Sequence, residues 1–289
     1  MSRWRTIVAC TLVVSTTAAV GTVAGPAAAQ MAASSSTGSS SVWDPPPGTT
    51  WQWQITGHVD PSYAVQMYDV DLFEAAPGEV NDGIVDHLHS QGITVVCYVD
   101  TGAWESYRPD ASDFPKSVIG NRTYASTGAP WVGERWLDIR RRAWPRFAGI
   151  IWRRLDLAVS LGCDGVEPDQ NNPWGNHPGF PITLAQQKAW YLKVAAEAHA
   201  RGLSVGMKNG VESIDADTAA AFDWALNEEC FQYHECGRYQ PFVDAGKAVF
   251  QVEYRGTTAS LCPKAARWRF SSMKKHLRLG PWVAPCWSR

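Results

Sequence analysis

The sequence lacks the short motifs by which many nucleotide-binding and zinc-dependent proteins are identified. Its 289 residues contain no G-x-G-x-x-G or Walker sequence, so nothing indicates a phosphate-binding loop. They also contain no C-x-x-C or H-E-x-x-H spacing, so a zinc site is not expected. We therefore expect a protein without a cofactor and without a metal.

Charged residues are scarce as well, at 19% of the chain, and neither sign dominates. Lys and Arg number 26, while Asp and Glu number 28. A nucleic-acid partner would need a basic face, so we expect none. A mildly acidic protein fits a neutral or cationic ligand better. The hydrophobic share of 45% allows a large core.

Long apolar runs are confined to the N-terminus. Arg3 and Arg5 precede an apolar run over residues 7–23, and three alanines at residues 27–29 provide a cleavage site. We predict a signal peptide over residues 1–29 and hence a secreted, extracellular protein. A membrane anchor is the alternative for this run. Since no later run is long enough to span a bilayer, we expect no membrane association after signal removal.

Seven cysteines are present, and Cys10 leaves with the predicted signal peptide, so an even number remains for an exported protein. Two pairs bracket short segments and are predicted as disulfides: Cys230 with Cys236, and Cys262 with Cys286. Cys97 and Cys163 lie in or beside apparent core strands, where buried free thiols are at least as plausible.

A linker rich in Ser, Ala and Pro is predicted over residues 30–47, followed by a single domain over residues 48–289. In this domain a glycine repeatedly closes a helix, and a short apolar run follows that ends in a polar residue. Such runs are residues 93–100, 163–169, 203–209 and 247–254, and further strands are expected at 65–71, 136–139, 222–228 and around Phe270. About eight βα units predict an α/β protein, a (β/α)8 TIM-type barrel of ~250 residues. An open doubly wound sheet is the alternative.

Ionisable residues stand at or near the ends of these strands. They are Asp69, Asp71, Asp100, Asp138, Glu167, Asp169, Lys208, Glu228 and Glu253. In a barrel the carboxyl ends of the strands converge on one mouth, where carboxylates repel one another and their pKa values rise. Such an arrangement favours acid/base chemistry or a cationic ligand over a purely structural role. We therefore predict that these residues line a substrate site.

Glycoside hydrolysis requires two carboxyl groups that flank the bond to be cleaved. Asp169 at the fourth strand and Glu228 at the sixth are the predicted catalytic pair, with Glu167 as the rival of Asp169. Glu229 is expected to point away from them. Lys208 could pair with a carboxylate, contact a sugar hydroxyl, or form a structural ion pair.

Aromatic residues are frequent, with 15 tryptophans. Trp104, Trp131 and Trp174 lie in predicted loops after strand ends, where they could stack on sugar rings or simply pack. Tyr98 and Tyr254 lie on strands and are expected to be core or supporting residues.

Several segments together resemble the endo-α-1,4-polygalactosaminidase family, glycoside hydrolase family 114. They lie at residues 51–54, 68–73, 97–98, 108–110, 134–140, 162–169, 227–230 and 252–254. The resemblance runs from about Trp51 to the C-terminus. It implies a (β/α)8 barrel that cleaves α-1,4 links in partly deacetylated, cationic galactosamine-containing polysaccharide. It also implies catalytic roles for the strand-four aspartate and the strand-six glutamate, which correspond to Asp169 and Glu228.

The prediction is thus a monomeric, secreted endo-glycosidase whose partner is a polysaccharide substrate. Three other functions stay open at this point. They are a non-catalytic carbohydrate-binding barrel of the cell surface, a metal-dependent hydrolase that uses the acidic residues as ligands, and a structural protein of the cell wall.

Overall fold

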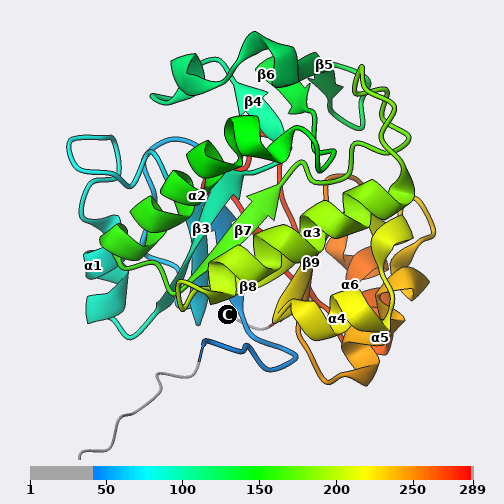
Figure 1. Ribbon diagram of the computed structural model, residues 1–289. Helices are drawn as coiled ribbons and strands as arrows, with labels where there is room; N and C mark the ends of the chain where they lie inside the picture. Colours follow the sequence, from blue (N-terminus) through cyan, green and yellow to red (C-terminus); the bar gives the residue numbers. More distant parts are fainter. Residues whose placement is uncertain (1–41, 288–289) are drawn as a thin grey trace, which may run out of the picture. The chain divides into compact units, whose positions relative to one another are not determined.

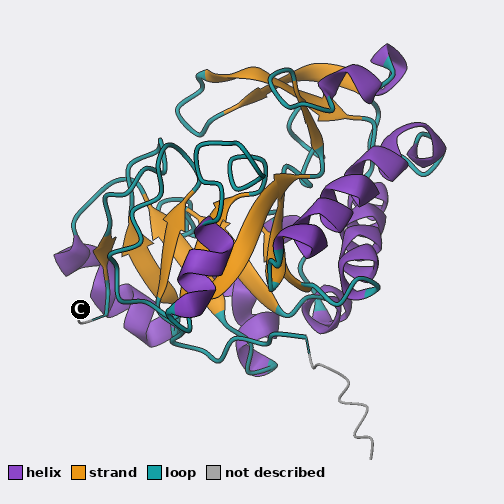
Figure 2. Ribbon diagram, turned by 90° about the vertical axis from the view of Figure 1, so that its left-hand side faces the viewer, coloured by secondary structure: helices purple, strands orange, loops and turns teal. Residues whose placement is uncertain are grey.

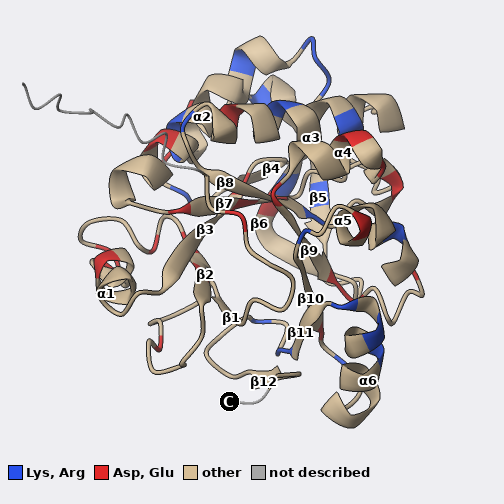
Figure 3. Ribbon diagram, turned by 90° about the horizontal axis from the view of Figure 1, so that it is seen from below, with Lys and Arg blue, Asp and Glu red and all other residues tan. Residues whose placement is uncertain are grey.

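The protein, described over residues 42–287 by a computed structural model, is built on a sheet of eight parallel strands. They are β1 (Trp51–Gln54), β2 (Met67–Asp71), β3 (Thr94–Asp100), β7 (Gly165–Asp169), β8 (Ser204–Lys208), β9 (Trp224–Glu228), β10 (Val249–Glu253) and β11 (Ser271–Lys274). A short ninth strand, β12 (Ala284–Pro285), pairs antiparallel with β11. Figure 3 shows the parallel strands arranged around a ring in sequence order. The predicted α/β barrel is confirmed.

The two edges of this sheet are joined by side chains. The Trp51 indole nitrogen donates a hydrogen bond to the Ser271 carbonyl oxygen at 2.9 Å. The Lys275 ammonium donates to the Gln52 side-chain oxygen at 3.0 Å. Strands β1 and β11 are thereby held together, and the sheet can enclose a filled interior.

Helices cover the outer face of the sheet. They are α1 (Ile84–Ser90), α2 (Trp144–Leu161), α3 (Leu184–His199), α4 (Ala216–Ala221), α5 (Gln240–Asp244) and α6 (Thr258–Trp268), with short 3-10 turns at Ala111–Asp113, Lys116–Val118, Val211–Ser213 and Cys236–Tyr239. The long helices α2 and α3 lie alongside one another across strands β3, β7 and β8 (Figure 1). Helix α3 opens with a capping box in which Thr183 and Gln186 satisfy each other's backbone N–H groups.

The strands are buried on both faces, as parallel strands between an interior and a helical layer must be. The interior contains large aromatic rings, with Trp224 and Phe250 at 5.4 Å between ring centroids. Gly206 makes room for this packing, because a Cβ at that position would lie 2.1 Å from the Trp224 ring. The interior is a packed core, and the larger cavity described below opens at the carboxyl ends of the strands.

One predicted barrel strand belongs elsewhere. Residues 136–139 were expected in the barrel, but they overlap β6 (Pro130–Leu137), which forms a separate antiparallel sheet with β4 (Ala103–Glu105) and β5 (Ile119–Tyr124). This sheet is inserted between β3 and α2 and stands apart from the barrel in Figure 2. The missing barrel strand is β1, whose two glutamines interrupt the apolar pattern that marks the other strands.

Three disulfide bonds tie the described chain together. Cys230–Cys236 and Cys262–Cys286 confirm the predicted pairs. For Cys97 and Cys163 the sequence left free thiols and a disulfide open, and the structure shows a disulfide with their Cα atoms 6.0 Å apart. Cys97 points from β3 toward the helical layer, where Cys163 lies just before β7, and their sequence separation of 66 residues hides this proximity in the sequence.

The predicted signal peptide and most of the predicted linker lie outside the described residues. The described residues, 42–287, belong to one compact unit. Among residues 42–287, no helix is both long enough and apolar enough to cross a membrane.

Candidate functional site

A cavity of about 1150 Å³ opens at the carboxyl ends of the barrel strands. Its floor is formed by Trp53, Tyr98, Asp169, Lys208 and Glu228. The loops after the strands form most of its walls, and the inserted sheet forms one side. The cavity therefore lies where the βα loops of a barrel place a functional site.

Lys208 is the centre of the charged floor. Its ammonium nitrogen lies 2.6 Å from Glu167 Oε1, 3.1 Å from Asp169 Oδ2 and 3.5 Å from Glu228 Oε2. Burial disfavours its charge, but the three carboxylates outweigh burial and raise the pKa of Lys208 well above its ordinary value. Because one nitrogen contacts all three groups, strands four, five and six bring their charged ends together. The predicted pair of Asp169 and Glu228 shares this contact.

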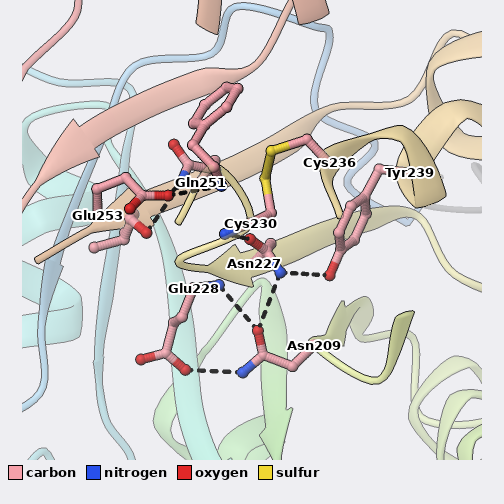
Figure 4. The surroundings of a disulfide bond; sticks show 10 residues. Asn209, Asn227, Glu228, Cys230, Cys236, Tyr239, Gln251 and Glu253 are labelled. Atoms are coloured by element: carbon pink, nitrogen blue, oxygen red, sulfur yellow. Dashed lines mark hydrogen bonds between the residues drawn. A yellow bond between two sulfur atoms is a disulfide. The ribbon is translucent and has the colours of Figure 1, made fainter. Parts of the chain in front are cut away.

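Glu228 is held by a set of donors around its carboxylate. Asn209 Nδ2 donates to Oε2 at 2.8 Å, and the Tyr254 hydroxyl donates to Oε1. Asn209 also accepts the Glu228 backbone N–H at 2.9 Å, so one amide holds both ends of the residue (Figure 4). Burial raises the pKa of Glu228, but the charge of Lys208 and these hydrogen bonds prevail and lower it. Glu228 is therefore ionised in the free protein.

The loop that follows Glu228 is fixed by the Cys230–Cys236 disulfide. Cys230 donates its backbone N–H to Asn227 Oδ1 at 2.8 Å, and Asn227 Nδ2 donates to the Tyr239 hydroxyl at 2.9 Å (Figure 4). Asn227 thus connects the carboxyl end of β9 to the disulfide loop. This packing holds the backbone on which Glu228 is carried.

Asp169 is positioned by the turn that follows β7. Its Oδ1 accepts the Gln170 backbone N–H at 2.7 Å, and its carbonyl oxygen accepts the N–H groups of Thr101 and Gly102. The backbones approach so closely here that a Cβ at Gly102 would lie 1.8 Å from the Gln170 carbonyl oxygen. Only glycine fits, and the turn cannot relax away from the cavity.

Glu167 and Asp69 lie beneath the floor and are fully buried. The Trp53 indole donates to Glu167 Oε2 at 3.0 Å. Burial is the main reason that the pKa of Glu167 rises to about 7, against the opposing charge of Lys208. Burial and the neighbouring Glu167 raise the pKa of Asp69 well above its usual range. Both Asp69 oxygens are buried without a hydrogen-bond partner among the described residues, so Asp69 lies beneath the floor instead of facing the cavity.

Strained backbone marks the three strand ends of the site. Gln170, Asn209 and Glu229 each follow the last residue of a strand and have φ values of 57°, 47° and 63°. Non-glycine residues adopt this left-handed conformation only at a cost of about 1–3 kcal/mol. The same conformation turns Glu229 back toward the cavity that it helps to line, although strand alternation predicted that it points away.

The other predicted substrate residues separate into two groups. Asp71 lines the cavity and forms a bidentate pair with Arg108, at 2.7 and 2.5 Å. The residues outside the cavity lining are Asp100, Asp138, Glu253, Trp104 and Trp174. Their substrate contacts stay a prediction, and the structure gives most of them other partners.

These partners are local. Asp138 pairs with Arg140 at 2.6 Å, while Asp100 accepts the Ala103 backbone N–H at 2.9 Å. Glu253 accepts the Phe231 backbone N–H, and the Trp104 indole donates to the Ala111 carbonyl. Trp174 is 44% exposed on the loop after β7. A strand-end position alone does not decide whether a side chain turns into the barrel mouth or into a neighbouring loop.

Several cavity residues were not predicted as part of the site. Tyr254 and Asn209, which contact Glu228, were assigned a supporting role or none, and Tyr107, Tyr124 and Glu134 come from the inserted sheet. The sequence does give one indication for Asn209: it directly follows Lys208 at the end of a strand, where site residues of a barrel lie. Trp131, suggested as a stacking residue, does line the cavity.

The cavity is strongly acidic. The acidic lining residues are Asp71, Glu74, Glu79, Glu134, Asp169, Glu212, Glu228, Glu229 and Glu235, while the basic ones are Arg108, Lys208 and Arg278. Burial and the nearby Asp71 raise the pKa of Glu74 to about 7, and burial and Glu212 raise the pKa of Glu235. Within residues 42–287, no group of three or more His, Cys, Asp or Glu residues is arranged to hold a metal ion. The arrangement instead suits a ligand that carries positive charge.

Comparison with known proteins relates this geometry to a family. Residues 32–289 match the family described as Glycoside-hydrolase family GH114. An uncharacterized protein of Deinococcus radiodurans is 30% identical over 202 residues, which cover 64% of this chain and 63% of that protein. This chain therefore spans less than two thirds of that relative.

Two solved structures are similar in fold. Aspergillus fumigatus Ega3 in complex with galactosamine matches with a TM-score of 0.74 and 34% identity, over 84% of this chain and 97% of Ega3. The glycoside hydrolase domain of PelA from Pseudomonas aeruginosa matches with a TM-score of 0.63 and 11% identity, over 81% and 97%.

Proposed function

Because this chain belongs to glycoside-hydrolase family GH114, we propose that it is a secreted endo-glycosidase that cleaves α-1,4 links in galactosamine-containing polysaccharide. The proposed substrate is partly deacetylated, so that it carries ammonium groups. The acidic cavity supports this choice, because carboxylates stabilise ammonium groups. The similar Ega3 structure holds galactosamine, which agrees with an amino-sugar substrate.

The observation that carries the proposal is the shared contact of Asp169 and Glu228 with Lys208. Their contacting oxygens lie 3.1 and 3.5 Å from the same nitrogen. The two oxygens can be no farther apart than the sum of these distances, about 6.6 Å, which includes the roughly 5–5.5 Å spacing of retaining glycosidases and only the lower edge of the roughly 6.5–9.5 Å of inverting ones.

The proposed reaction has two steps. One carboxylate attacks the anomeric carbon while the other, protonated, gives its proton to the leaving oxygen as the glycosidic bond breaks. A water molecule then attacks the same carbon, releases the enzyme carboxylate, and returns a proton to the second group. Lys208 keeps its charge beside both groups and holds them in place between the steps.

Product analysis on amino-sugar polymers of different acetylation tests this function. We expect the wild type to generate new reducing ends from α-1,4-galactosamine polymer, with retention of the anomeric configuration. D169N and E228Q should each lower the rate by at least about a thousandfold, because a catalytic carboxyl is lost. D86N, an exposed change on α1 outside the cavity lining, is the matched control and should retain activity.

Azide rescue of D169A and E228A would show which of the two residues is the nucleophile and which is the acid/base. Azide should give the inverted glycosyl azide where the nucleophile is missing and the retained azide where the acid/base is missing. Binding of polymer without any new reducing ends would refute the hydrolase and support a carbohydrate-binding barrel instead.

A further inference from the structure

The inserted three-stranded sheet presents an aromatic surface to the cavity. Tyr107, Tyr124, Trp131 and Val132 all line the cavity, and all come from this one insertion. Tyr107 is 57% exposed, Tyr124 58% and Val132 87%. Single exposed apolar residues are ordinary on protein surfaces, but a group of them on one wall of a cavity marks a binding surface. We refer to Tyr107, Tyr124, Trp131 and Val132 as the aromatic wall.

A carboxylate stands within the same wall. Glu134, on β6, lines the cavity and accepts hydrogen bonds from the Tyr107 hydroxyl at 3.3 Å and from Thr123 Oγ1 at 3.1 Å. Among the described residues, no Lys or Arg lies within ion-pair distance of Glu134, although its neighbour Glu105 pairs with two arginines. Burial, Glu105 and Asp169 raise the pKa of Glu134 to about 7. A cation that enters the cavity would therefore find an unpaired acidic group there.

The wall and the bond-cleaving pair come from different parts of the fold. Asp169 and Glu228 stand on barrel strands β7 and β9, whereas the wall belongs to a sheet inserted after β3. The cavity, at about 1150 Å³, exceeds the range of roughly 300–1,000 Å³ that is usual for a single small ligand. There is room for more than the sugar that is being cleaved.

We propose that the aromatic wall and Glu134 form a further binding subsite for a hexosamine unit of the polymer, beyond the unit whose bond is cleaved. This proposal rests on the proposed function and extends it to chain-length preference. The apolar C–H face of the sugar packs on Tyr124 and Trp131, and its ammonium group pairs with Glu134. Only chains that reach from Asp169 and Glu228 to the wall gain from this contact.

Y124A and E134Q test the subsite in the full-length protein. The measurement is the ratio of kcat/KM for long polymer to kcat/KM for the shortest oligosaccharide that the wild type cleaves. We expect each variant to lower this ratio about three- to tenfold, mainly through KM on polymer, because one aromatic or one charged contact is removed. W282A is the matched control, since Trp282 is 43% exposed and lies outside the cavity lining. Its ratio should equal that of the wild type.

Acetylation separates the two contacts. On fully acetylated polymer, which carries no ammonium group, Y124A should still weaken binding while E134Q should have no effect. An unchanged ratio in Y124A, or an equal loss on short and long substrates, would overturn the proposal. So would an E134Q effect that is the same on acetylated and deacetylated polymer.

Failure of the proposed function is recognised separately, because the wild type would then produce no reducing ends. In that case calorimetric binding of the same polymers replaces KM. A weaker affinity of Y124A than of the wild type would uphold the subsite, and equal affinities would overturn it.

Discussion

Replacing Lys208 with methionine removes a buried cation and keeps a side chain of similar length. Lys208 is 1% exposed and contacts Glu167, Asp169 and Glu228. Removing one partner of a buried ion pair costs about 3–5 kcal/mol because the other partner stays buried and uncompensated. Domains have a free energy of unfolding of only about 5–15 kcal/mol, so K208M should be strongly destabilised at neutral pH.

The size of this loss should depend on pH. Without the cation, the pKa values of Glu167 and Glu228 rise, and Glu167 already titrates at about 7 in the wild type. A carboxyl whose folded pKa lies above its unfolded value destabilises the protein as pH rises from the unfolded to the folded pKa, by about 1.4 kcal/mol for each unit of difference. Lys208 itself keeps its charge over this range because its pKa is raised. The loss should therefore be larger at pH 8 than at pH 5.

Urea unfolding followed by tryptophan fluorescence, at pH 5, 6.5 and 8 with disulfides intact, measures this difference. K188M is the matched control, because Lys188 pairs with the more exposed Asp215 and Asp217. Its loss should stay near about 0–1 kcal/mol at every pH. A K208M loss that equals that of K188M, or that does not grow between pH 5 and pH 8, would refute the reasoning.

Two further predictions concern neighbouring features. N209D replaces the amide that donates to Glu228 Oε2 by an acceptor, so the pKa of Glu228 should rise. The limb of the activity–pH profile that reports Glu228 should then move up by about one pH unit or more. N176D, at an exposed residue of the cavity, is the control. An unmoved limb would contradict the assigned contact. Replacing Cys97 and Cys163 by alanine opens a 66-residue loop and should lower the free energy of unfolding by about 4 kcal/mol, measured in urea; a loss below about 1 kcal/mol would contradict the estimate.

Local signals in the sequence predicted much of the barrel. Glycine after a helix, followed by an apolar run and a polar end, identifies a buried parallel strand wherever all three parts are present. Residues 163–169 and 203–209 have this pattern, and they carry Asp169 and Lys208. The convergence of these residues on one mouth then follows from the barrel itself.

These local signals do not predict which distant strands or cysteines pair with each other. Residues 136–139 have a strand pattern, but the pattern does not reveal which sheet a strand joins. β1 was overlooked because its glutamines bond to loops, such as Gln52 to the Pro281 carbonyl oxygen at 2.8 Å. The Cys97–Cys163 bond likewise joins residues whose sequence surroundings say nothing of each other.

The direction of strand-end side chains was also hidden. Asp169 faces the cavity, whereas Asp138 turns to Arg140 two residues later in the chain. The left-handed turns at Gln170, Asn209 and Glu229 are set by tertiary contacts, and none of these residue types requires such a turn. Acidity at the mouth was predictable, but its arrangement around Lys208 was not.

The Cys97–Cys163 bond has a consequence for how this protein can vary. It joins the two ends of the segment that contains the inserted sheet and α2. This joint lies beside the point where β3 and β7 pair. If this segment became longer or shorter or were exchanged, its two ends would stay fixed, so β3 and β7 would keep their register. The preference for polymer length could then change while the charged residues of the barrel floor stay in place.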